Sequence, residues 1–187
     1  MKYLLLLTAF YYNIYFSQFT SIPDPGFENA LISNGVDTIL DGQVLTQNIS
    51  GIQFLDVSDF GISNLTGIED FTSLVYLDCY DNLLTHLDVS SCTNLEWLDC
   101  ESNSLFSLDV SQNTMLQTLW CYENQLQSVN VTGCVNLQDF EFDNNLLTYV
   151  NLSTNVNLIH IDAWTNLLYS LDVSNCPNLQ SLEVYGN

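Results

Sequence analysis

Apolar and polar residues recur along this chain with a period of 21 residues. Leucine stands at one fixed place of the period and asparagine at another: leucine at 74, 95, 116, 137, 158 and 179, asparagine at 82, 103, 124, 145, 166 and 187. A constant period of this length is typical of a solenoid, in which each repeat buries its apolar side only against its neighbours. We therefore expect stacked coils instead of one globular core.

Within each repeat, which we number from position 1 at the leucine, the first half predicts a short strand. Positions 4 and 6 are apolar, as at Leu77 and Cys79, and positions 3, 5 and 7 are mostly polar or aromatic. An alternation of period two directs positions 4 and 6 into the core and the other three outward. The asparagine at position 9 follows this strand, where a short amide can satisfy the backbone groups of a buried turn.

The second half of the repeat predicts an extended or irregular return segment. Apolar pairs such as Leu87 and Val89, or Leu108 and Val110, again alternate with polar residues. Clusters of Ser, Asn and Thr leave no amphipathic stretch for a long helix. The predicted fold is thus a mostly β, α/β-type solenoid, with parallel strands on a concave face and extended segments on a convex face.

An N-terminal cap is expected before the regular coils. Residues 52–73 fit the same template with a 22-residue step, although Phe60 replaces the asparagine. A terminal repeat is commonly atypical. Further upstream, Asp24-Pro25-Gly26 precedes apolar residues at helical spacing and Asn34-Gly35 follows them, which predicts a short capping helix.

The predicted organisation has three parts, and the first is a signal peptide over residues 1–18. Lys2 precedes an apolar run from Tyr3 to Phe16, which has the length of a signal-peptide core and is short for a bilayer span. An uncleaved membrane anchor is the alternative. Residues 19–51 form the cap, and residues 52–187 form one 22-residue unit, five full 21-residue units and one incomplete unit. The last unit lacks its return half, which indicates either a fragment or an exposed, association-prone edge.

The repeat unit resembles a known family. Leu74-x-x-Leu77-x-Cys79-x-x-Asn82-x-Leu84 is similar to the leucine-rich repeat, and the longer first unit resembles those of internalin-like bacterial proteins. Residues 22–31 look like the N-terminal cap of secreted bacterial leucine-rich-repeat proteins. The resemblance implies a secreted or cell-surface binding module that acts in adhesion or another surface interaction.

The charge of the chain narrows the classes of partner. The sequence has 22 acidic residues and one basic residue, Lys2, so the chain without its signal peptide is a polyanion. Nucleic acids and anionic membrane surfaces are therefore disfavoured. Divalent cations, basic protein surfaces and neutral glycans remain open.

Six cysteines in an exported chain would ordinarily indicate disulfides. Here Cys79, Cys100 and Cys121 fall at the inward position 6 and act as small apolar core residues. The other three occupy position 19 of alternate coils, beyond disulfide reach of one another. We expect free buried thiols, with one neighbouring pair at position 6 as the main exception.

The outward strand face is the candidate binding surface, because it gathers all three tryptophans. Aromatic anchors surrounded by charge are typical of interfaces. The predicted partner-binding residues are Tyr76, Tyr80, Trp97, Trp120, Tyr122 and Trp164, with Asp78, Asp99, Glu141 and Asp162 to select basic groups. A glycan-binding surface, assisted by calcium or not, and a spacer without a ligand are the alternatives. Strand propensity and cross-strand pairing are the ordinary explanation for such aromatics.

One local set of outward residues has metal-binding chemistry. Asp139, Glu141, His160 and Asp162 lie on adjacent repeats and would suit calcium or a transition metal. A solvated acidic patch beside a single histidine is the ordinary alternative. No other cofactor is indicated. We predict no enzymatic activity, since the chain has no Gly-rich phosphate loop and no clustered serine, histidine and acid.

Overall fold

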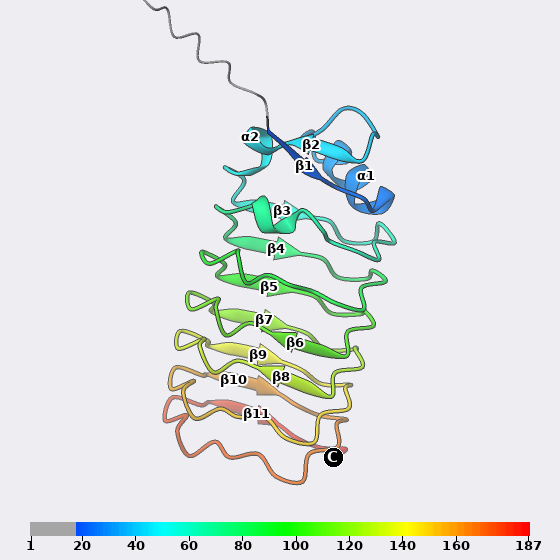
Figure 1. Cartoon of the computed structure of the whole chain (residues 1–187). Helices are drawn as coiled ribbons and strands as arrows, with labels where there is room; N and C mark the ends of the chain where they lie inside the picture. The colour runs from blue at the N-terminus through cyan, green and yellow to red at the C-terminus, as the bar shows by residue number, and fades with distance from the viewer. Residues whose placement is uncertain (1–17) are drawn as a thin grey trace, which may run out of the picture.

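The computed structural model describes residues 18–187, so the predicted signal peptide lies outside the described residues except for Gln18. Figure 1 shows a column of stacked coils with a separate cap at its N-terminal end. Seven short strands, one from each coil, form a parallel sheet in the order β11-β10-β9-β7-β5-β4-β3. The predicted parallel solenoid is confirmed. The strands are β3 (Phe54–Asp56), β4 (Tyr76–Asp78), β5 (Trp97–Asp99), β7 (Thr118–Trp120), β9 (Asp139–Glu141), β10 (His160–Asp162) and β11 (Ser181–Glu183).

The strand register follows the sequence period. Leu77 pairs with Leu98, one 21-residue step away, whereas Leu55 pairs with Leu77 across the longer first step. Equal steps bring identical positions side by side, and neighbouring parallel strands lie about 4.8 Å apart. Positions 1, 4 and 6 are fully buried through most of the column, so the coils share one continuous apolar core.

A ladder of asparagines joins each coil to the coil before it. The Oδ1 atom of Asn124 accepts the backbone N–H of Leu105 at 2.9 Å. Its Nδ2 atom donates to the carbonyl oxygens of Cys100 at 2.9 Å, Cys121 at 3.3 Å and Tyr122 at 3.1 Å. The amide thus satisfies both a donor and several acceptors of a buried turn, which explains why the sequence repeats this residue.

Each coil also turns through a left-handed residue just before the ladder position. Backbone φ lies near +50° at these sites, a region that side chains with a Cβ rarely adopt. Six of the seven residues at this place carry a side chain: Asp59, Asp81, Ser102, Glu123, Asn144 and Thr165. The last coil has Gly186 there, with φ +74°. Hydrogen bonds of the surrounding turn hold this conformation, as in Glu123, whose N–H donates to the Asp143 carbonyl at 3.1 Å.

The return segments are extended, and two of them pair. β6 (Ser107–Asp109) and β8 (Ser128–Asn130) form a second, two-stranded parallel sheet behind the first. Position 19 alternates between cysteine and asparagine along the column. The Asn113 Nδ2 atom donates to the carbonyls of Val89 and Cys92, both at 2.9 Å. The Cys134 thiol donates to the Val110 carbonyl at 3.1 Å, so either residue type supplies a donor there.

The N-terminal unit contains β1 (Phe19–Ser21) and β2 (Gln43–Leu45), which pair antiparallel, with α1 (Pro25–Ser33) and α2 (Thr46–Ile49). Asp24 caps α1, since its Oδ1 atom accepts the N–H groups of Gly26 and Phe27. Its Oδ2 atom accepts the N–H groups of Ser63 and Asn64 at 2.9 and 3.0 Å. One side chain thus fastens the helix to the first coil, which also carries the 3-10 turn η1 (Ile68–Asp70).

All six cysteines lie within residues 18–187, where they are buried and free. Burial raises the pKa of each thiol, with neighbouring carboxylates adding to the shift, for example in Cys79 and Cys134. These thiols are therefore held protonated in the core. In the same range no helix has the length and apolar character needed to cross a bilayer.

Candidate functional site

An aromatic row crosses the outer face of the seven-stranded sheet, which we call the strand face. It runs through Phe54, Tyr76, Trp97 and Trp120 on β3, β4, β5 and β7. The ring centroids are 6.3, 5.8 and 4.6 Å apart in that order. These separations are those of interacting aromatic pairs. Four strands therefore present one connected aromatic surface.

The tryptophans of this row keep unused hydrogen-bonding capacity. The Nε1 atoms of Trp97 and Trp120 are buried and have no hydrogen-bond partner. Burial raises the pKa of the neighbouring Asp139 carboxyl, and the proximity of His160 and Trp120 offsets only part of that shift. The Trp120 indole and Asp139 nevertheless fall outside hydrogen-bond geometry. Buried tryptophan N–H groups usually find a partner, so this surface is incompletely satisfied within the chain.

The remaining predicted aromatics follow a separate line at position 7. Trp164 stacks on Tyr185 with centroids 5.5 Å apart and ring planes 7° apart. Tyr80 is 36% exposed and Tyr122 is half-buried. Each of these rings is therefore at least partly accessible on the strand face.

An acidic row runs beside the aromatic row at position 5. Asp78 pairs in register with Asp99, and Glu141 pairs with Asp162. Trp120 interrupts the two pairs, since it lies in register between Asp99 and Glu141. Asp99 is only 6% exposed, which differs from the open carboxylate expected at an outward position. Its Oδ1 atom accepts the Glu101 backbone N–H at 3.1 Å, so part of its capacity is used internally.

Carboxyl groups on this face hold their protons unusually tightly. Burial first, and then the charge of Asp78, raises the pKa of Asp99 to about 6. Burial and neighbouring acids raise the pKa of Glu101 and of Asp143 to about 7. No lysine or arginine lies within residues 18–187 to offset this charge. The strand face is a surface that lacks its own cations.

Three members of this surface were not among the predicted site residues. Phe54 begins the aromatic row, and Glu101 and Asp143 carry the most strongly raised pKa values of its carboxyls. Their positions 3 and 7 in the repeat already placed them on the strand face. Asp143 is nonetheless 4% exposed, and its burial depends on neighbouring coils that a repeat template does not describe.

The structure brings together three of the four predicted metal ligands. Asp139, Glu141 and His160 each place a ligand atom within 4.8 Å of the other two. His160 Nε2 lies 3.7 Å from Glu141 Oε1. Asp162 stands in register beside Glu141 but is outside this set.

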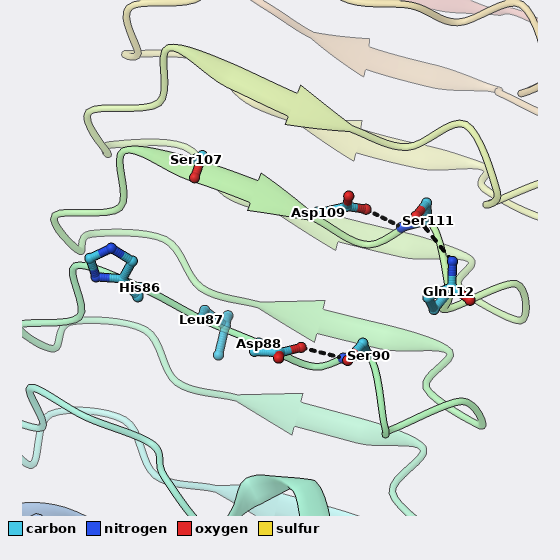
Figure 2. A pocket seen from close by; sticks show the side chains of 8 residues that line it. All are labelled: His86, Leu87, Asp88, Ser90, Ser107, Asp109, Ser111 and Gln112. Atoms are coloured by element: carbon cyan, nitrogen blue, oxygen red, sulfur yellow. Dashed lines mark hydrogen bonds between the residues drawn. The ribbon is translucent and has the colours of Figure 1, made fainter.

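A hollow on the return side offers a contrasting environment. Its volume is about 410 Å³, and it is lined by His86, Leu87, Asp88, Ser90, Ser107, Asp109, Ser111 and Gln112 (Figure 2). The Asp88 and Asp109 carboxylates accept the N–H groups of Ser90 and Ser111 at 3.0 and 2.9 Å. These bonds lower the pKa of both aspartates, so the acids stabilise turns and carry no reactive proton.

No model of a known protein family and no curated protein matches the sequence. Solved structures do match its fold. The functional domain of InlJ from Listeria monocytogenes, whose structure includes a cysteine ladder, is 24% identical over 90% of this chain and 48% of that chain, with a TM-score of 0.58. Internalin C2 from the same species is 22% identical over 92% of this chain and 90% of that one, also at 0.58. The chain has an internalin-like leucine-rich-repeat fold.

A third internalin, InlF of Listeria monocytogenes, has a TM-score of 0.62 at 17% identity and covers 89% of this chain and 57% of that one. The leucine-rich-repeat chain described here thus spans about half of the InlJ chain and most of the internalin C2 chain. At these identities the similarity establishes the fold, including its parallel strands and 21-residue coils.

Proposed function

We propose that this chain is an exported interaction module that binds a protein partner with a basic surface through its strand face. The connected row from Phe54 to Trp120 carries the proposal, because it joins exposed aromatic area to unpaired indole donors and adjacent carboxyls. Fold similarity to the internalins supports a non-enzymatic interaction module at a bacterial surface or in secretion.

The two rows have complementary roles in this proposal. Tyr76, Trp97 and Trp120 supply apolar contact, and cationic groups of the partner can pack on their ring faces. Asp78, Asp99 and Glu141 supply negative charge that selects lysine or arginine over neutral side chains. The raised pKa values support this division, since burial and then neighbouring acids disfavour the charged carboxylates, and a bound cation would favour them.

The test is selection of protein fragments from a displayed library on the purified chain, followed by affinity measurement with variants. Trp97→Ala combined with Trp120→Ala should weaken a selected partner by at least about a hundredfold, as expected for central aromatic anchors. The matched control removes two exposed aromatics elsewhere, Phe106→Ala with Tyr169→Ala, and should leave affinity unchanged. Equal affinity of the double tryptophan variant would refute the strand face as the binding surface.

Salt dependence separates this function from glycan binding by the same aromatics. Affinity for a basic protein should fall steeply between low and high ionic strength, because several carboxylates take part. Stacking of a neutral sugar on Trp164 or Trp97 would change little with salt. A spacer without a ligand would yield no partner whose binding depends on either row.

A further inference from the structure

Asp139, Glu141 and His160 form a mixed nitrogen and oxygen cluster on adjacent strands. Asp139 and Glu141 lie two residues apart on β9, so both point to the strand face, and His160 is the register neighbour of Asp139 on β10. The three ligand atoms all lie within 4.8 Å of one another. Strand geometry therefore fixes the backbone positions from which these side chains converge.

The internal contacts of the cluster leave it unsatisfied. His160 Nε2 and Glu141 Oε1 are 3.7 Å apart, beyond the range of a hydrogen bond. The Oδ1 atom of Asp139 is buried and has no hydrogen-bond partner. A buried carboxylate oxygen without a donor is costly, so an additional positive group would stabilise the cluster.

The distances suit one ion placed between the three groups. Zinc binds histidine nitrogen and carboxylate oxygen at about 2.0–2.2 Å, which sets two ligands of a tetrahedral site roughly 3.4 Å apart. Small rotations of Glu141 and Asp139 would close the remaining gap. Trp120 flanks the cluster on the next strand, in register with Glu141, and gives it one apolar side.

The donor set distinguishes among metals. Calcium takes six to eight oxygen ligands, whereas this cluster offers an imidazole and two carboxylates. Imidazole with carboxylate favours zinc and neighbouring first-row ions. Three protein ligands with open positions is the count found in non-structural zinc sites.

We propose that Asp139, Glu141 and His160 bind a divalent transition-metal ion of the zinc type on the strand face. This site shares Glu141 with the proposed surface for a basic protein, but metal binding does not require that partner. The two carboxylates would balance the charge of the ion within a chain whose described part has no lysine or arginine. Within the described residues His86, on the return side, belongs to no such cluster of ligand atoms. Its Nδ1 atom instead contacts the hydroxyl of Thr85.

The test measures zinc binding to the purified chain by competition with a chromophoric chelator. We expect one tight equivalent, weakened at least about tenfold by His160→Ala, because even residues that only support metal ligands contribute that much. His86→Ala is the matched control and should bind as the parent does. Glu141→Gln provides a second variant if His160→Ala fails to fold, which circular dichroism would show. Absence of saturable binding, or equal binding by the folded cluster variant, would overturn the proposal.

Cobalt substitution identifies the ligands directly. A site of imidazole and carboxylates should give visible absorption without the near-ultraviolet band of a cobalt–thiolate bond. A thiolate band would assign the metal to the cysteines and overturn the proposal. Displacement of cobalt by an equal concentration of calcium would also overturn it, because the cluster would then be an ordinary acidic patch. Partner affinity is also measured with a chelator present. Partner binding that persists without metal shows that the two proposals stand or fall separately.

Discussion

Trp97 and Trp120 meet edge to face across two neighbouring strands, with ring centroids 4.6 Å apart and planes inclined at 70°. They are not register partners, since Trp97 pairs with Thr118 and Trp120 pairs with Asp99. Their contact is diagonal, and it moves the aromatic row from position 3 to position 5. The row therefore crosses the acidic row between Asp99 and Glu141 instead of running parallel to it.

This diagonal contact should be measurable as a coupling energy. Trp97→Ala and Trp120→Ala each remove a partly buried ring, and together they should destabilise the chain by less than the sum of the single changes. We expect a coupling of about 0.5–1.5 kcal/mol from urea unfolding of the two single variants and the double variant. Trp120 and Trp164, whose rings do not pack against each other in the described part of the chain, serve as the control. Additive behaviour of Trp97 with Trp120 would contradict the contact.

Stability should fall as pH rises from about 4 to 8. The carboxyls of Asp99, Glu101 and Asp143 have raised folded pKa values of about 6, 7 and 7, so the folded state binds more protons than the unfolded state in this window. The stabilisation from the protonated, buried carboxyls is fully present below the ordinary carboxyl pKa near 4. It is lost as the pH rises through the folded pKa values. The unfolding free energy should drop by on the order of a few kcal/mol, measured by denaturant titration at several pH values.

One double variant assigns this pH dependence to the strand face. Asp99→Asn combined with Asp143→Asn should flatten the dependence of the unfolding free energy on pH between pH 5 and 8. The neutral amides do not titrate, so these two positions no longer bind more protons in the folded state than in the unfolded state. Below pH 4 the sign reverses, since Asp88 and Asp109 have lowered pKa values and lose favourable hydrogen bonds on protonation. A parent profile that rises from pH 5 to pH 8 is inconsistent with the burial of these carboxyls.

The asparagine ladder should be far more sensitive than other asparagines of the same repeat. Asn124→Ala removes four hydrogen bonds and leaves the Leu105 N–H buried without an acceptor, so we expect a loss of about 3 kcal/mol or more. Asn136 donates one bond to the Thr114 carbonyl near the surface, and Asn136→Ala should cost less than about 1 kcal/mol. Similar losses in the two variants would argue against the structural role of the ladder.

The cap and the first coil should lose their connection when Asp24 is replaced. Asp24→Ala removes an N-cap and the bonds to Ser63 and Asn64, so we expect about 2–4 kcal/mol of destabilisation. Asp41→Ala, on an exposed loop of the same unit, is the control. Hydrogen exchange should show that the variant loses amide protection mainly in α1 and the first coil. Protection of residues 25–33 equal to that of the parent chain would contradict this role of Asp24.

The thiols should be unreactive in the folded chain. All six are buried and their pKa values are raised, so alkylation under native conditions should modify none of them within the described fold. After denaturation without reductant, mass spectrometry should find six modified cysteines. Four modified cysteines would instead indicate one oxidised pair, for which neighbours such as Cys100 and Cys121 are the candidates.

Repeat architecture could be predicted from sequence because it depends on a period, and the period fixes register. The spacing of leucine and asparagine placed Trp97, Asp78 and His160 on one face, and the strands confirm that placement. The pairing of β6 with β8 was less predictable. All return segments have similar alternation, yet within residues 18–187 only β6 and β8 pair as strands.

The chemistry of the strand face was harder to predict because it depends on side-chain contacts between coils. A template labels Asp99 and Asp143 as outward, yet both are buried. The same limit applies to the cluster at His160, since position alone did not separate Asp162 from the three side chains that converge. Burial and convergence arise from the neighbours of each residue, and the repeat pattern fixes only the backbone.

The asparagine ladder gives the stack a direction. Each ladder amide closes the turn of the preceding coil, as Asn103 does when it accepts the Leu84 N–H and donates to the Cys79 carbonyl. A coil is therefore complete only after the next coil has been placed upon it. Because synthesis delivers the chain from its N-terminus, each newly made coil supplies the hydrogen bonds that complete the turn of the coil before it.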